Sequence, residues 1–152
     1  MLIEVVSVAD AEEILGLQKS AYQSEAAIYN DYSIPPLTQT LEEIQSDFEK
    51  HIYLKAVIQG QIIGSVRGCF RDGTCFVGRL IVNPDLQNQG IGTQLIQAIE
   101  DYFPQAQRYE IFTGDKSERN LYLYEKLGYQ KFKKEALTDQ VTLVYLEKVV
   151  SC

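Results

Sequence analysis

The sequence predicts a mixed α/β protein in which one sheet carries helices on both faces. Its 152 residues, 45% of them hydrophobic, are enough for one domain with a core and too few for two domains of ordinary size. Three neighbouring runs near the middle of the chain are rich in β-branched residues, and amphipathic helical stretches lie before and after them. Because no repeat, low-complexity tract or linker interrupts the chain, we expect a single domain over residues 1–152.

The chain is predicted to open with a strand and a long helix. Residues 3–8, "IEVVSV", are typical of a strand. Residues 9–27 predict a helix that opens on Asp10, because Glu13 three residues later completes an N-terminal capping signature.

A long connection and a second helix follow. Pro35 and Pro36 are expected to exclude a helix from the connection, because proline lacks the backbone N–H that a helix interior requires. Thr40 followed by Glu43 repeats the capping signature, so we expect a short helix from there to about Glu49.

The middle of the chain predicts an antiparallel meander. Turn signals at Gln59-Gly60 and Asp72-Gly73 separate three strand-like runs, at residues 53–58, 61–70 and 74–82. The third run places apolar residues on both faces of the strand, which favours a central position in the sheet.

The remaining elements alternate between helix and strand. Apolar residues recur at three- and four-residue spacings in residues 91–103, which predicts an amphipathic helix. We then expect a strand at 108–113, a helix at 117–128 that ends at Gly128, and closing strands at 129–135 and 141–147. The expected order is therefore βααβββαβαββ.

The bulk composition excludes several classes of protein. A net charge of −7 disfavours binding to nucleic acid and favours a cationic small molecule. No apolar run approaches the roughly 18 residues of a membrane span, and the first residues lack the features of a signal peptide, so we expect a cytoplasmic protein without membrane contact. Three cysteines without CxxC spacing and one histidine suggest neither a disulfide framework nor a metal site (Cys69, Cys75, Cys152 and His51).

Two glycines mark the junction between the third run of the meander and the next helix. Gly90 and Gly92 stand in "LQNQGIG", where a helix N-terminus with unpaired N–H groups can bind phosphate if no side chain blocks the approach. Both glycines also permit positive φ, and Gln87, Asn88 and Gln89 add neutral donors. The stretch is neither a GxGxxG fingerprint nor a P-loop, and an ordinary flexible loop is the alternative.

The longer stretch "VGRLIVNPDLQNQGIGTQLIQAIEDY" resembles the acetyl-CoA-binding segment of the GNAT superfamily of N-acetyltransferases. Gln87, Gly90 and Gly92 match the family pattern [QR]xxGx[GA], and the element order agrees along essentially the whole chain. The resemblance implies a GNAT-like acyl-CoA N-acyltransferase fold, a strand end that bulges and splays, and acetyl-CoA as acyl donor. The implied cofactor-binding residues are Leu80, Ile81, Val82, Gln87, Asn88, Gln89, Gly90, Ile91, Gly92, Thr93 and Asn120.

A second group of candidate site residues lies in "NLYLYEKLGY". Asn120 and Tyr124 are four residues apart and so share one face of a helix. The resemblance implies that Asn120 contacts the pantetheine arm and that Tyr124 protonates the leaving thiolate. Reference pKa values near 10 for a phenol and 8.5 for a thiol are compatible with that transfer. The alternative is that Tyr122, Tyr124 and Tyr129 are all packing residues.

The proton acceptor is not determined by the sequence. The third run of the meander offers no carboxylate or histidine, although many family members carry a carboxylate there. Glu25, Glu110 and a relay of water molecules stay open as the base. Arg79 is interpreted as a solvated or paired strand residue without a catalytic role.

These observations predict an enzyme that moves an acetyl group from acetyl-CoA to a primary amine by direct attack, without a metal. We expect the acceptor, a small cationic molecule, to bind between the loop 26–40 and the hairpin 71–74. A peptide or protein amine, another acyl-CoA, and a non-catalytic CoA-binding module are the alternatives. The oligomeric state is not determined, and a homodimer is one of the states left open.

Overall fold

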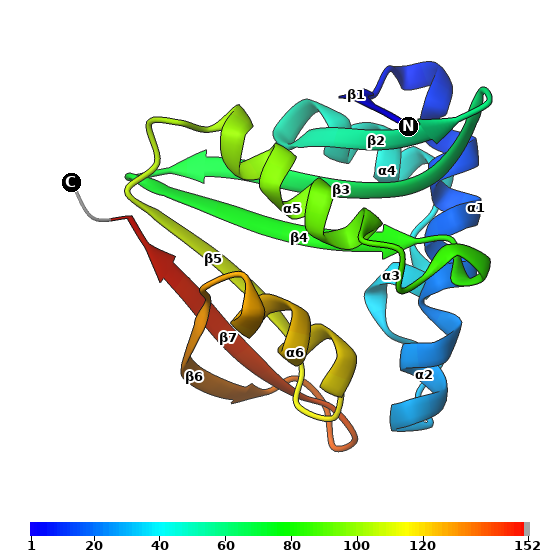
Figure 1. Cartoon of the computed structure of the whole chain (residues 1–152). Coiled ribbons are helices and arrows are strands. Elements are labelled where there is room, and N and C mark those ends of the chain that lie inside the picture. Colours follow the sequence, from blue (N-terminus) through cyan, green and yellow to red (C-terminus); the bar gives the residue numbers. More distant parts are fainter. Residues whose placement is uncertain (151–152) are drawn as a thin grey trace.

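The computed structural model describes residues 1–150, which form one twisted seven-stranded sheet flanked by helices (Figure 1). The strand order is β1-β2-β3-β4-β5-β7-β6, so β4 is the central strand, as its apolar faces predicted. The strands are β1 (Leu2–Val5), β2 (Ile52–Ile58), β3 (Gln61–Arg71), β4 (Thr74–Val82), β5 (Arg108–Gly114), β6 (Gln130–Ala136) and β7 (Thr142–Val149).

The helices cover both faces of the sheet (Figure 1). One face carries α5 and α6 over a large core, and the other carries α1 and α4 over a smaller core of Ala11, Ile14, Ile44 and Ile62. The helical elements are η1 (Val8–Asp10), α1 (Ala11–Ala21), α2 (Gln23–Tyr29), α3 (Pro35–Thr38), α4 (Leu41–Lys50), η2 (Pro84–Leu86), α5 (Ile91–Tyr102) and α6 (Glu118–Lys126). Within residues 1–150, no helix has the length and apolar character needed to cross a membrane.

The helical segment between β1 and β2 departs from the prediction in two respects. The single helix expected over residues 9–27 is divided at Tyr22 into α1 and α2. The expectation that Pro35 and Pro36 exclude a helix is wrong, because both lie in the first turn of α3, where proline costs no hydrogen bond.

The two predicted capping signatures have different outcomes. Thr40 and Glu43 form the expected capping box, with reciprocal hydrogen bonds of 2.9 and 3.1 Å. The helix α1 begins directly after Asp10, as predicted, but the expected cap does not form: Asp10 instead accepts a hydrogen bond from the Ser7 N–H at the start of η1, and Glu13 accepts one from the Ile62 N–H at 2.8 Å. Glu13 thus anchors α1 to the sheet rather than capping it.

The meander has the predicted hairpins and an additional bulge. Both residues of each turn have positive φ, as a type I′ hairpin requires (Gln59, Gly60, Asp72 and Gly73). The register between β3 and β4 shifts so that Arg79 and Leu80 lie opposite the single residue Val66, and Arg79 has a φ of 50°. A bulge redirects side chains, and this one interrupts β4 near its carboxyl end.

The sheet opens between β4 and β5. The two strands pair in parallel over only three residues each, 74–76 with 108–110. Figure 1 shows them diverging beyond this point, so the carboxyl half of β4 has no strand on that side within residues 1–150. The opening is the feature of the fold that positions the candidate site.

Candidate active site

A cavity of about 550 Å³ lies beside the carboxyl end of β4. Its wall is formed by the end of α1, α2, the segment from β4 to the first turn of α5, and α6. It includes all but one of the residues predicted to bind the cofactor: Leu80, Ile81, Val82, Gln87, Asn88, Gly90, Ile91, Gly92, Thr93 and Asn120. Gln89 is exposed and does not line the cavity.

Glycine is needed at positions 90 and 92 for different structural reasons. Gly90 caps α5 with a φ of 80°, and a Cβ built there would meet no atom within 4 Å, so the backbone is open to the cavity. Gly92 does not adopt the positive φ that glycine permits, because it lies within α5. A Cβ on Gly92 would lie 3.3 Å from Leu123, so this glycine allows α5 and α6 to approach each other closely.

Two cations of this cavity were missed by the sequence interpretation. Arg119 and Lys126 line the wall from α6, and the Arg119 guanidinium donates a hydrogen bond to the side-chain carbonyl of Gln87. Their seven-residue separation places them on one helix face, and this spacing was the available signal. Together with the open backbone at Gly90, they make the cavity suitable for phosphate groups.

A second cavity of about 210 Å³ is lined by residues of both β4 and β5. It shares four wall residues with the larger cavity: Tyr22, Glu25, Leu80 and Asn120. Its remaining wall includes Tyr124 and apolar side chains from α3, β5 and the β6–β7 hairpin. A ligand in the larger cavity and a ligand in the smaller one would therefore meet at these shared residues.

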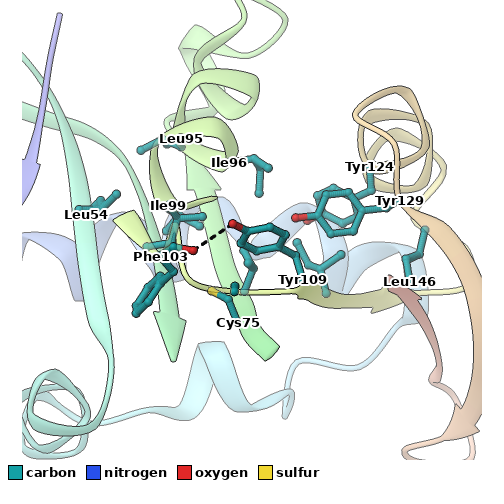
Figure 2. Close-up of a cluster of buried hydrophobic side chains, with 14 of the residues drawn as sticks. Leu54, Cys75, Leu95, Ile96, Ile99, Phe103, Tyr109, Tyr124, Tyr129 and Leu146 are labelled. Carbon is teal, nitrogen blue, oxygen red and sulfur yellow. Dashed lines mark hydrogen bonds between the residues drawn. The ribbon is translucent and has the colours of Figure 1, made fainter. Parts of the chain in front are cut away.

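The Tyr124 hydroxyl differs from those of its buried neighbours. Figure 2 shows the Tyr124 ring beside that of Tyr129, with centroids 6.3 Å apart. Tyr129 donates to Glu100 at 2.8 Å and Tyr109 donates to the Phe103 carbonyl at 3.1 Å, whereas Tyr124, only 3% exposed, has no hydrogen-bond partner within residues 1–150. The hydroxyl oxygen itself is not fully enclosed, and Tyr124 lines the smaller cavity, so its proton is available to a ligand there.

Burial keeps this hydroxyl protonated. Loss of solvation, followed by the nearby Tyr22 and Glu25, raises the pKa of Tyr124 above its usual value near 10. At neutral pH the group is therefore a neutral phenol with a proton to donate. Tyr122, in contrast, is 71% exposed, so the three tyrosines of this segment do not share one packing role.

Of the two candidate carboxylates, only Glu25 lies in the site. It accepts hydrogen bonds from the Ser117 hydroxyl and, at 3.4 Å, from the Asn120 amide. Glu110 forms an ion pair with Arg108 at 2.8 Å, where β4 and β5 are still joined, and it lines neither cavity. The geometry therefore removes Glu110 from the candidate bases.

Of the two segments expected to bind the acceptor, only the first lines the smaller cavity. The loop 26–40 contributes Tyr29, Ile34, Pro35 and Pro36 to the smaller cavity. The hairpin 71–74 contributes nothing, because it lies at the opposite end of β4 (Figure 1). The β6–β7 hairpin takes its place with Leu137, Val141 and Leu143.

Two arginines enter the smaller cavity in different states. Arg67 is paired with Asp47 at 2.6 Å. Arg79 is half-buried, so the expectation of a solvated or paired residue holds for only part of its side chain: its Nε is buried and has no hydrogen-bond partner within residues 1–150. Burial lowers the pKa of Arg79 from its ordinary value, and the nearby positive charge of Arg67 lowers it further.

Asp47 is expected to contribute to stability in a pH-dependent way. Burial opposes its ionisation, but the His51 ring 3.1 Å away, the hydrogen bond from Tyr53 and the charge of Arg67 outweigh burial and lower the pKa of Asp47. Asp47→Asn should reduce the free energy of unfolding at pH 7 by about 2–4 kcal/mol, because Arg67 loses its ionic partner.

The loss of stability in Asp47→Asn is expected to depend on pH. A carboxylate with a lowered folded-state pKa stabilises the protein above its unfolded pKa of about 4 and loses that effect as pH falls through the folded value. Urea unfolding should therefore show parent and Asp47→Asn converging below pH ~4. The exposed Asp101→Asn serves as control; equal effects of the two variants at pH 7 would contradict the prediction.

Comparison with known proteins gives the family. The sequence profile of the Acetyltransferase (GNAT) family matches residues 12–129. The chain therefore belongs to the GNAT family of acetyltransferases and is an acyltransferase. The split sheet and the bulged central strand agree with the bulged and splayed strand end that the family resemblance implied.

The fold also matches solved structures along nearly its whole length. The PaiA N-acetyltransferase from Thermoplasma acidophilum in complex with coenzyme A has a TM-score of 0.80 at 17% identity, covering 99% of this chain and 100% of that one. The ribosomal-protein-S18-alanine N-acetyltransferase from Escherichia coli has a TM-score of 0.81 at 14% identity, covering 99% and 94%. At these identities the likeness shows the fold.

A curated relative is longer than this chain. UPF0157 protein YqkA from Bacillus subtilis is 31% identical over 121 residues, which is 80% of this chain and 35% of that protein. The chain thus spans about a third of that relative's length.

Proposed function

We propose that this protein transfers an acetyl group from acetyl-CoA to a small primary amine, with the donor in the larger cavity and the amine in the smaller one. The single observation that carries this proposal is the meeting of the two cavities at Tyr22, Glu25, Leu80 and Asn120, beside the unpartnered Tyr124 hydroxyl. Family membership supports the reaction class.

The residues of the larger cavity fit the donor. The N-terminus of α5 and the loop 87–93 would hold the pyrophosphate, because the backbone at Gly90 is open and α5 presents free N–H groups there. Arg119 and Lys126 would add charge-assisted contacts to phosphate. Asn120 and the unpaired backbone of residues 80–82 would bind the pantetheine arm.

The bound thioester would supply an acetyl group that an amine can attack directly. Backbone N–H groups of β4 near Leu80 and Val82 would polarise its carbonyl, since they face the opening without a partner strand. As the amine nitrogen bonds to the acetyl carbon and the carbon–sulfur bond breaks, Tyr124 donates its proton to the sulfur. Glu25, at the junction of the cavities, accepts the proton lost by the amine, directly or through water.

The alternatives are distinguished by chemistry. The smaller cavity is below the roughly 300–1,000 Å³ of ordinary ligand pockets, which favours a small acceptor over a folded protein surface. A non-catalytic CoA-binding module would have no use for the Tyr124 hydroxyl. Coenzyme A release across a panel of amines, repeated with longer acyl-CoAs, separates these functions. The buried Cys75 thiol, whose pKa burial raises to about 12, should not react with the thiol reagent used for detection.

Acetyl-CoA is expected to raise the melting temperature. A ligand that binds only the folded state, present at 100 times its Kd, adds about 2.7 kcal/mol. For a chain of this length that corresponds to roughly 5–10 °C. Differential scanning fluorimetry with acetyl-CoA, and with adenosine as control, measures the shift. No shift with either acetyl-CoA or coenzyme A would contradict the assignment of the larger cavity.

A further inference from the structure

The smaller cavity contains a positive charge that the chain does not neutralise. The Arg79 Nε is buried without a hydrogen-bond partner, and no ion pair joins Arg79 to a carboxylate within residues 1–150. Arg79 as a whole is half-buried, and an Nε–H that has lost water without gaining a partner costs free energy unless a ligand supplies that partner. The bulge of β4 nevertheless holds this residue at positive φ in the cavity wall.

The nearby acidic groups are already engaged. Asp47 pairs with Arg67 and also accepts a hydrogen bond from Tyr53. Glu25, in the walls of both cavities, accepts hydrogen bonds from Ser117 and Asn120. The Tyr22 hydroxyl also lies beside Arg79 but is a neutral phenol that leaves the charge in place, so Arg79 is the cation of the smaller cavity that is available to a ligand.

We propose that Arg79 binds the carboxylate of an amino acid, and that the amino group of this molecule is the acetyl acceptor. The guanidinium presents its donors in a planar fork that matches a carboxylate. Glu25 would face the amine, and the apolar residues Ile34, Leu137, Val141 and Leu143 would receive an apolar side chain. The substrate class is therefore a small apolar amino acid, and the products are its N-acetyl derivative and coenzyme A.

This inference rests on the proposed function and revises one expectation from the sequence. The net charge of −7 favoured a purely cationic acceptor. Net charge acts at long range and is screened within about 8–10 Å at physiological salt, whereas a desolvated group in the wall is screened much less. The local charge of Arg79 should therefore decide which amines bind.

The test compares matched acceptors. Leucine, leucinamide and isopentylamine form one series, and phenylalanine, phenylalaninamide and phenethylamine form another. We expect kcat/KM to be on the order of 10- to 100-fold higher for each amino acid than for its amide or amine, the range of a charge-assisted contact. In Arg79→Gln this preference should disappear, with Arg79→Lys retaining part of it. Arg71→Gln, at an exposed arginine that ends β3 and lines neither cavity, is the control.

A second measurement separates binding from structure. Calorimetric titration of N-acetylleucine should show at least 10-fold weaker binding to Arg79→Gln, while circular dichroism and the melting temperature verify that the variant is folded. Two results would overturn the inference and leave the proposed function standing. One is acetylation of amines with no preference for a carboxylate, and the other is an equal fall in kcat/KM for the amino acid, its amide and the amine in Arg79→Gln. Failure to bind acetyl-CoA would instead overturn the proposed function.

Discussion

Replacement of Tyr124 by phenylalanine is expected to lower kcat by roughly 10- to 1,000-fold, the range for one proton-transfer group, and to leave the affinity for coenzyme A within a few-fold. The ring and its packing stay, and only the hydroxyl is lost. That hydroxyl has no partner within residues 1–150 and is held neutral by burial, so its proton is available to the leaving sulfur.

Stability provides a second readout. Because Tyr124 makes no hydrogen bond, its replacement should be nearly neutral in the free energy of unfolding. The matched control Tyr129→Phe removes a hydroxyl that donates to Glu100, so it should cost about 1.5–3 kcal/mol and leave kcat near the parent value. Steady-state kinetics and urea unfolding of both variants measure the contrast. An unchanged kcat for Tyr124→Phe, with chemistry rate-limiting, would make Tyr124 a packing residue.

Gly90→Val should weaken binding of coenzyme A by at least an order of magnitude. Valine disfavours the φ of 80° at this position, and its side chain would project into the space assigned to the pyrophosphate. The fold should survive, because a Cβ there meets no atom of the protein within 4 Å.

The chain offers a close control for backbone strain. Gly60 has a φ of 76°, and a Cβ there also meets nothing within 4 Å, but it lies in the β2–β3 turn and lines neither cavity. Gly60→Val should therefore carry a similar conformational cost and leave the Kd for coenzyme A unchanged. Calorimetric titration of both variants, with circular dichroism to verify folding, is the measurement. Equal affinities would show that the loop at Gly90 does not bind the phosphates.

The sequence predicted those parts of the fold that depend on neighbouring residues. The hairpin turns at Gln59-Gly60 and Asp72-Gly73 and the Thr40 capping box were predicted because each is defined within a few residues. The role of Glu13 was not, because its partner Ile62 lies 49 residues away and no local pattern distinguishes that contact from a cap.

In the candidate site, too, features defined by neighbouring residues were predicted and contacts between distant residues were not. The loop at Gly90 and the pair Asn120 and Tyr124 have local spacing, and both were found in walls of the two cavities. The lack of an ion pair at Arg79 could not be predicted from the sequence. It depends on the bulge in β4 and on contacts between distant residues, since Asp47 is engaged by Arg67 and Glu25 by Ser117. Long-range competition for partners decides whether a charge is paired.

The limited overlap between the two cavities has an evolutionary consequence. Only four residues belong to both walls, whereas α3 and the β6–β7 hairpin contribute to the smaller cavity alone. Insertions or exchanges in these two segments can accumulate without altering the residues proposed to hold the donor, because surface connections tolerate such changes better than the elements that they join. Descendants of one ancestral gene could thus diversify in the amines they accept through these two segments, and exchanging them between relatives is a rational first step for redesigning specificity.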